Sequence, residues 1–174
     1  YFKHCREVTI ELSEEFLPFN PSSYWEYHKD ALIGLIAQSL TGICGTILCE
    51  TGIPLPAKIE IPGHDADNSF VLSETQTGRF FRLLLPGNYN LRFSADYHYP
   101  QEIENIQVSK DNLTQINVVL KHAEKADPSA DHMIDIVDVI LCLKMAIGLQ
   151  QIDLASCDMN DDGFIDISDV ILML

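Results

Sequence analysis

The chain has 174 residues, of which 47% are hydrophobic, and a formal net charge of −15 at pH 7. This balance argues against a nucleic-acid partner, because the phosphate backbone would be repelled. No apolar run approaches the roughly 20 residues of a membrane span, and the N-terminal YFKHC has none of the parts of a signal peptide. The length fits one large domain or two to three small ones, and both ends are expected to be truncations of a longer protein.

The first predicted element is a strand at residues 4–16, HCREVTIELSEEF. Apolar and polar residues alternate through it, which is typical of a strand with one apolar face. Glu11 lies in the middle of its polar face. A helix is predicted next, from a capping box at Ser23 to Gly42. One strand and one helix do not make a domain, so residues 1–41 are predicted to end a larger one.

Residues 42–122 contain short β-rich runs that are separated by Gly, Pro, Asn and Asp. Seven such strands within one segment predict an antiparallel β-sandwich. His64, Asp65 and Asp67 are close in sequence and are predicted to be solvated loop residues. The strands are predicted at 43–49, 57–61, 69–73, 79–85, 89–95, 102–108 and 114–121.

The five cysteines leave at least one thiol unpaired within the chain. Their spacing matches no zinc finger or CxxC motif. Cys142 and Cys157 could meet if their segments pack together. Most of the five are predicted to be small buried hydrophobic residues, and they are Cys5, Cys44, Cys49, Cys142 and Cys157.

Residues 123–174 contain an internal repeat. DIVDVILCL at 135–143 recurs as DISDVILML at 166–174, with seven of nine positions identical. A repeated unit this short is expected to pack against its twin.

The second repeat begins with the acidic loop DMNDDGFIDISD at 158–169. Calcium is held by oxygen atoms, which an EF-hand-type loop supplies from positions 1, 3, 5, 7, 9 and 12, with glycine at position 6. Gly163 occupies that sixth position. The expected ligands are Asp158, Asn160, Asp162, the carbonyl group of Phe164, Asp166 and Asp169.

The first repeat begins with a matching loop, DPSADHMIDIVD at 127–138. His132 stands at its sixth position, where a positive φ costs a non-glycine residue on the order of 1 kcal/mol. We therefore expect two calcium sites, of which the first is weaker. Its expected ligands are Asp127, Ser129, Asp131, the carbonyl group of Met133, Asp135 and Asp138.

An alternative interpretation is that these loops are two acidic helix N-termini, which are common and stabilising. One loop alone fits that interpretation. Two loops in tandem, with matching ligand positions and matching helices after them, favour calcium, because four carboxylates in each loop would repel one another without a cation.

The repeat pair resembles a type I dockerin through DMNDDGFIDISDVILML, with aspartate at position 12 and no helix before the loop. This resemblance implies a fold around two calcium ions and docking onto a cohesin module. In that family, partner choice is set by loop positions 10 and 11 and by outward residues of the following helix. The corresponding residues are Ile136, Val137, Lys144, Met145, Ile167 and Ser168.

The first two segments resemble zinc carboxypeptidases of the N/E/D type. The matching stretches are CREVTIELS, YWEYHKDALIGLIAQSLTGICGTI and GRFFRLLLPGNYNLRFSA, in the family's order and spacing. The resemblance implies that the predicted helix is the last helix of a catalytic domain and that a transthyretin-like sandwich follows. It also implies that Glu11 is the catalytic base and acid, because a carboxylate beside a zinc-bound water can move its proton.

The zinc ligands of that family, an HxxE pair and a later His, have no counterpart in this chain. The predicted fold is mixed α and β: the end of an α/β carboxypeptidase catalytic domain (1–41), a transthyretin-like sandwich (42–122) and an α-helical calcium-loop pair (123–174). Zinc is expected only in the full-length enzyme.

Two functions are compatible with these features. The first is the C-terminal part of a secreted zinc carboxypeptidase that removes C-terminal residues from peptides or proteins, inactive by itself and fused to a calcium-dependent docking module. The second is a non-catalytic calcium-dependent adaptor with the sandwich as a spacer. Loops of this type suit the millimolar calcium outside cells, which favours an extracellular location.

Overall fold

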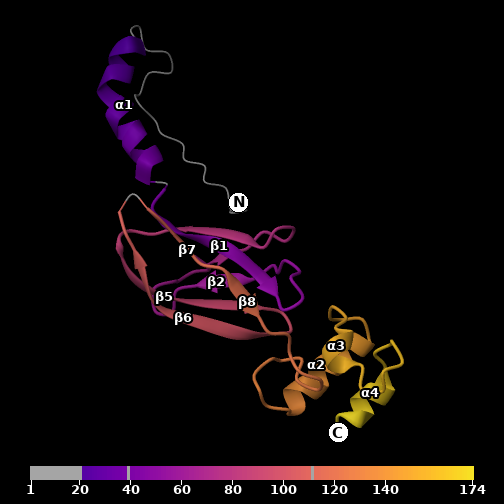
Figure 1. Ribbon diagram of the computed structural model, residues 1–174. Helices are drawn as coiled ribbons and strands as arrows, with labels where there is room; N and C mark the ends of the chain where they lie inside the picture. The colour runs from indigo at the N-terminus through magenta and orange to yellow at the C-terminus, as the bar shows by residue number, and fades with distance from the viewer. Residues whose placement is uncertain (1–20, 39, 111) are drawn as a thin grey trace.

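The computed structural model describes residues 21–38, 40–110 and 112–174. Glu11, Cys5 and the strand expected around them lie outside these residues. The described chain is of mixed α and β type and has three regions. Figure 1 shows helix α1 (Pro21–Gln38) projecting from one end of the β-sandwich and a region of short helices at the other end.

Two four-stranded sheets form the sandwich, in the orders β4-β1-β7, with β8 also paired to β1, and β3-β2-β5-β6. Apolar side chains alternate along the strands and meet between the sheets, with Ile43, Ile47, Leu91 and Phe93 fully buried in one core. The strands are β1 (Gly42–Cys49), β2 (Lys58–Glu60), β3 (Val71–Leu72), β4 (Arg79–Leu83), β5 (Gly87–Ala95), β6 (His98–Val108), β7 (Leu113–Gln115) and β8 (Val118–Leu120).

The last expected strand differs from its prediction in two ways. It is split into β7 and β8, and both pair with β1 in parallel, so the sandwich is not wholly antiparallel. Parallel pairing is possible because the chain from β2 to β6 serves as a long crossover. At the break, the Asn117 side chain accepts hydrogen bonds from the backbone N–H and hydroxyl groups of Thr46. Gly45 is needed here, since an added Cβ would lie 1.6 Å from the carbonyl oxygen of Ile116.

Helix α1 begins at Pro21, so the capping box expected at Ser23 is wrong, and Gly42 is the first residue of β1 and not a helix end. Proline suits the first helical position because its fixed φ is already helical. Large apolar side chains of this helix, including Trp25 and Ile33, are more than half exposed. Of the described helices, none is long and apolar enough to cross a membrane.

Of the three residues expected to be solvated, His64 and Asp67 are exposed, and Asp65 is the correction. Its carboxylate forms an ion pair with Arg82, whose Nη1 also donates to the carbonyl oxygen of Ile59, and both charged side chains are largely buried. Burial acts to raise the pKa of Asp65, but hydrogen bonds from Arg82 and from the N–H of Ile61 outweigh it and lower the pKa. This pair is part of the sandwich structure.

The repeat region contains α2 (Ile136–Ala146), α3 (Leu154–Cys157) and α4 (Ile167–Leu172). The helices of the two repeats, α2 and α4, pack against each other, as the sequence predicts. Cys142, Met145, Cys157 and Val170 form their shared buried core. Cys142 and Cys157 do meet there, as free thiols, and burial raises the pKa of Cys157 to about 12.

Candidate functional site

Each acidic loop ends in a capping box that starts the following helix. In the first loop, the Asp135 side chain accepts from the N–H of Val137, and the Asp138 side chain accepts from the N–H of Asp135. Asp166 and Asp169 repeat this pattern at the start of α4. Loop positions 9 and 12 therefore carry a structural role in both repeats, in the manner of reciprocal helix caps.

The carboxylate of the first residue in each loop accepts hydrogen bonds from the turn that follows it. Asp158 accepts from the N–H groups of Asp162 and Gly163, at 3.2 and 2.9 Å. Asp127 accepts from the N–H groups of Asp131 and His132, at 3.3 and 3.0 Å. The two loops thus wrap around their first carboxylate in the same way.

Left-handed backbone occurs at the same two positions of both loops. Position 4 is Ala130 at φ 57° in one loop and Asp161 at φ 61° in the other. Position 6 is His132 at φ 68° and Gly163 at φ 84°. The sequence correctly predicts that position 6 requires a positive φ, and His132 adopts it although it has a Cβ.

The carboxylates at positions 1 and 12 are buried. Asp138 and Asp169 are 0% exposed, Asp127 is 3% exposed and Asp158 is 7% exposed. Within the described residues, none of the four forms an ion pair with Lys, Arg or His. Buried carboxylates are costly without a compensating charge.

Hydrogen bonds keep two of these groups ionised. Burial acts to raise the pKa of Asp169, but N–H donors from Asp166, Met159 and Asn160 outweigh it, and the pKa is lowered. The pKa of Asp127 is likewise lowered, because the Tyr99 hydroxyl and backbone N–H groups outweigh the effect of burial. The loops therefore concentrate negative charge that the hydrogen bonds alone do not neutralise.

The donor set fits calcium, because it consists of carboxylate, amide, hydroxyl and carbonyl oxygens. Across 21–38, 40–110 and 112–174, no three His, Cys, Asp or Glu side chains are already gathered as a metal cluster. The oxygens of positions 1 and 12 face backbone N–H groups, and Asp131 and Asp162 at position 5 are exposed. Cation binding would have to draw these exposed carboxylates inward.

Position 3 differs between the loops. The Ser129 hydroxyl donates to Asp127 at 3.2 Å. The Asn160 side-chain oxygen accepts from the N–H of Asp162 at 3.0 Å, and its amide nitrogen donates to the Asp162 carboxylate. At position 7, the side chains of Met133 and Phe164 point to solvent, which leaves only their backbone carbonyls as potential ligands.

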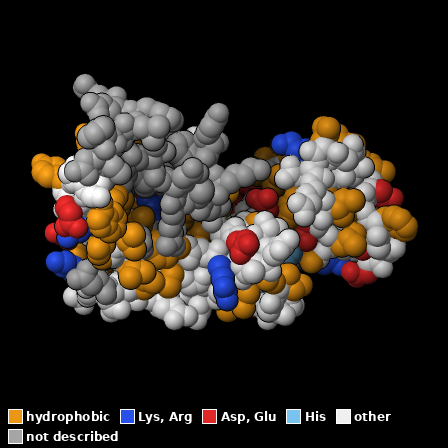
Figure 2. Space-filling view, turned by 90° about the horizontal axis from the view of Figure 1, so that it is seen from above, with side chains coloured by type: hydrophobic (Ala, Val, Ile, Leu, Met, Phe, Trp, Pro, Cys, Tyr) orange, Lys and Arg blue, Asp and Glu red, His pale blue; other side chains and the backbone are white. Residues whose placement is uncertain are grey.

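The predicted partner-binding residues divide into two groups. Ile136, Val137 and Ile167 are about half exposed or more, and Lys144 and Ser168 are also exposed. Figure 2 shows hydrophobic side chains spread over the repeat region, at the right of the view, with acidic side chains among them.

Met145 is a correction to this set. It is 2% exposed and packs in the core with Cys142 and Cys157. Asp138, Cys142 and Met145 follow one another at helical spacing, so they lie on the inner face of α2. This position cannot belong to an outer contact surface.

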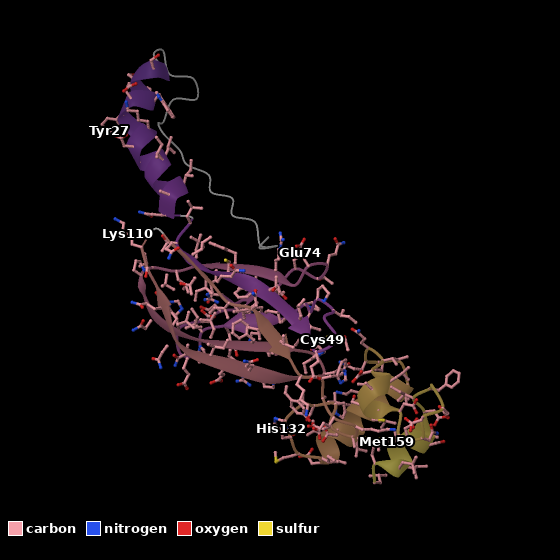
Figure 3. All side chains as sticks on the ribbon, viewed as in Figure 1. Tyr27, Cys49, Glu74, Lys110, His132 and Met159 are labelled. Carbon is pink, nitrogen blue, oxygen red and sulfur yellow. The ribbon has the colours of Figure 1, made fainter. Side chains whose placement is uncertain are left out.

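Sequence reasoning missed the contacts between the sandwich and the repeats. The Tyr99 hydroxyl of β6 donates to Asp127 at 2.9 Å, and its ring stacks on His132. Within the 123–174 region, Lys125 donates to Asp161 at 2.6 Å. Figure 3 shows His132 beside the end of the sandwich. The only signal in the sequence was the aromatic run Tyr97-His98-Tyr99 at the start of a strand.

Curated proteins similar to this chain are carboxypeptidases. Mouse carboxypeptidase D is 32% identical over 122 residues, which cover 67% of this chain and 8% of that protein. Mouse carboxypeptidase M is 32% identical over 100 residues, covering 54% and 21%, and the mouse carboxypeptidase N catalytic chain is 30% identical over 123 residues, covering 69% and 26%. The matched part is about a quarter or less of the length of each relative. No family model matches the chain.

Among solved structures, a type II cohesin–X-dockerin complex from Acetivibrio cellulolyticus covers 76% of this chain and 92% of the matched chain, with a TM-score of 0.45 and 18% identity. A putative carbohydrate binding protein from Bacteroides uniformis covers 45% of this chain and 40% of its own, with a TM-score of 0.35 and 21% identity. A TM-score below 0.5 does not establish a shared fold.

Proposed function

We propose that the repeat region is a calcium-dependent docking module and that the rest of the chain is the C-terminal part of a secreted zinc carboxypeptidase. One observation carries the calcium proposal. Two loops of different sequence adopt the same hydrogen-bonded turn around buried carboxylates that have no cationic partner among the described residues.

A divalent cation would neutralise the charge of each loop. The buried oxygens at positions 1 and 12 are already oriented by their N–H donors, position 9 is held as a helix cap, and the carboxylates at position 5 are exposed. Calcium tolerates irregular geometry and takes six to eight oxygen ligands, so it suits such a set better than magnesium. We expect two sites, of which the loop containing Gly163 is the stronger.

Calorimetry tests this proposal directly. Calcium titrated into the chelator-treated chain should show uptake at two sites, and Asp158→Ala should weaken only the second. Asp67→Ala, which removes an exposed acidic side chain from the sandwich, is the matched control and should change neither site. No calcium uptake by the intact repeat pair would refute the proposal.

The partner that we propose is a cohesin-type module. The observation behind it is the exposed apolar surface at equivalent positions of both repeats, Ile136 and Ile167 after the loops and Ile140 and Ile171 one turn later. Binding to immobilised cohesin modules should require calcium and should weaken at least tenfold in the variant Ile136→Asp/Ile167→Asp. Binding that survives chelator would count against a calcium-dependent dock.

The carboxypeptidase assignment rests on similarity to carboxypeptidases D and N over about two thirds of the chain and to carboxypeptidase M over 54% of it. It is supported by α1, whose exposed apolar side chains suit a helix that packs against another part of a longer protein. In the full-length enzyme, Glu11 would be the general base and acid beside zinc. The chain alone should neither bind zinc stoichiometrically nor cleave C-terminal residues from peptides, and cleavage by this chain would overturn that expectation.

The alternative is a non-catalytic adaptor in which the sandwich is only a spacer. The full-length sequence separates the two, because an HxxE pair and a later His upstream would supply the zinc ligands. Their absence would leave Glu11 an ordinary strand residue. The calcium proposal is unaffected by this choice.

A further inference from the structure

The sandwich and the repeat region share a continuous junction. The chain after β8 pairs with the start of β6: the N–H of Tyr99 donates to the carbonyl oxygen of Lys121, and the N–H of Ala123 donates to that of Tyr97, at 2.9 and 2.8 Å. The ring of His98 meets the ring of His122 edge to face. The connection between the two regions is therefore fixed by backbone pairing.

Two tyrosines at this strand end reach into the repeat region. The Tyr97 hydroxyl donates to the carbonyl oxygen of Gln151 and accepts from the Gln150 side chain, and its ring packs on the repeat core. Tyr99 is 7% exposed and packs with Ala123 and Ala130. The sandwich thus supplies side chains to the interior of its neighbour.

Tyr99 also contacts a predicted calcium ligand. Its hydroxyl accepts from the N–H of Glu124 at 3.2 Å and donates to Asp127 Oδ2 at 2.9 Å. Its ring lies parallel to the His132 ring, with centroids 3.8 Å apart and planes 6° apart. The residues it touches are loop positions 1 and 6, and these two are themselves joined by the hydrogen bond from the N–H of His132 to Asp127.

The second loop has no such neighbour from the sandwich among the described contacts. Asp158 accepts only from backbone N–H groups of its own loop, and Gly163 has nothing within 4 Å of where a Cβ would be. The contact with Tyr99 is therefore an asymmetry that comes from outside the loops, in addition to the internal difference at position 3.

We propose that Tyr99 is a positioning residue for the first loop, so that cation binding there is coupled to the sandwich–repeat junction while binding at the second loop is not. The hydroxyl fixes Asp127 Oδ2, so a cation would engage Oδ1, which accepts from the Ser129 hydroxyl and the N–H of Asp131. The ring holds His132 in its left-handed conformation. Partners of metal ligands that act in this way typically change metal affinity about 10- to 100-fold. This inference rests on the proposed calcium function.

Calorimetry on the full chain tests it with paired variants. Asp162→Ala disables the second loop, so calcium uptake then reports on the first loop. Asp131→Ala disables the first loop, so uptake then reports on the second. Tyr99→Phe should weaken calcium binding about tenfold in the Asp162→Ala background and by less than twofold in the Asp131→Ala background. Tyr97→Phe removes the other junction hydroxyl, which touches no loop ligand, and is the matched control.

The outcomes distinguish failure of the role proposed for Tyr99 from failure of the proposed calcium binding. No uptake in either background refutes the proposed function. Uptake at both loops with Tyr99→Phe equal to wild type, or with Tyr97→Phe equally weakening, refutes the role of Tyr99 alone.

Hydrogen exchange gives a second readout, whose main comparison is the unaltered chain with and without calcium. Calcium should slow exchange at the amides of Tyr99 and Ala123, which make the junction hydrogen bonds, and Asp127→Asn should abolish that slowing. Calcium-dependent protection confined to the loops, with Tyr99 and Ala123 unchanged, would contradict the coupling.

Discussion

His132 and Gly163 occupy the sixth position of two loops that fold alike. Glycine reaches φ 84° without steric cost, whereas histidine holds φ 68° although it carries a Cβ. His132 stacks on Tyr99, and Gly163 faces open space. One loop therefore meets the backbone requirement through its own residue type, and the other meets it through a contact made by a different region of the chain.

This difference teaches that a missing glycine does not by itself predict a defective loop. Judged from the sequence, His132 marks the weaker site, because nothing local offsets its conformation. In the structure, the stacked ring and the Tyr99–Asp127 hydrogen bond supply support that the second loop lacks. The first loop is therefore supported from outside where the second is supported by its own glycine.

Removal of calcium should have the largest effect. At a free calcium concentration 100-fold above the dissociation constant, each site adds about 2.7 kcal/mol to the free energy of unfolding. Chelator should therefore lower the urea midpoint of the repeat region. The first loop should lose its calcium before the second if Tyr99 only partly compensates for the strain at His132. Hydrogen exchange at α2 and α4 measures the loss, and the core amide of Ile47 in the sandwich is the internal control. Equal midpoints with and without chelator would contradict stabilisation by calcium.

Replacement of the buried position-12 carboxylates should come next. Asp169→Ala leaves the N–H groups of Met159, Asn160 and Asp166 without their acceptor, and the free energy of unfolding in chelator should fall by about 2 kcal/mol, since a buried unsatisfied donor costs about 1–3 kcal/mol.

Asp138→Ala should cost a similar amount, because Ser129 and Asp135 lose the same acceptor. Asp161→Asn alters a loop residue that is exposed and only ion-paired to Lys125, so it should change stability by less than about 1 kcal/mol. A small effect at position 12 in both loops would mean that these carboxylates are not structural before calcium binds.

Substitutions at position 6 test the comparison between His132 and Gly163. Gly163→Ala meets no neighbouring atom and should lower stability by about 1 kcal/mol through backbone strain alone. His132→Gly should be nearly neutral, because relief of strain is offset by loss of a ring stack worth about 0.5–1.5 kcal/mol. In a Tyr99→Leu background, His132→Gly should instead stabilise by about 1 kcal/mol. Urea unfolding in chelator measures all three, and the same response of His132→Gly in both backgrounds would show that the stack carries no energy.

The sequence predicted the positive φ at position 6 of both loops, because the turn is set by near neighbours. The calcium ligands stay a prediction. Asp158, Gly163 and Asp169 lie within one stretch of 12 residues, and the repeat supplies an independent copy of the pattern. Their backbone geometry follows from hydrogen bonds between near neighbours. The burial of Met145 could also have been predicted, because helical spacing from Asp138 places it on the inner face. The analogy to an outward position in the dockerin family led to the wrong prediction.

The remaining features depend on contacts between distant segments. Alternation along residues 114–121 predicts a strand but not its direction, so the parallel pairing with β1 could not be foreseen. Arg82 of β4 and Asp65 of the loop after β2 are separated in the sequence by β3, and they become partners only once the sheets pack. The Tyr99–Asp127 bond likewise depends on how the sandwich meets the repeats, and neither residue shows a pattern that selects the other.

Position 3 offers the smallest and most local test. The side-chain oxygen of Asn160 accepts from the N–H of Asp162. The hydroxyl of Ser129 instead donates to Asp127, and among the described contacts it accepts no such bond. Ser129→Asn would give the first loop the turn of the second and add an amide oxygen as a ligand, so calcium affinity there should rise several-fold. The reciprocal Asn160→Ser should lower affinity at the second loop by a similar factor.

Both variants are measured by calorimetry in backgrounds that silence the other loop, Asp162→Ala for the first and Asp131→Ala for the second. If both shift affinity in the expected directions, the residues at position 3 account for part of the difference between the sites, independently of the sandwich. If Ser129→Asn changes nothing while Tyr99→Phe does, the first loop is limited by its junction with β6, and its own ligands are already adequate.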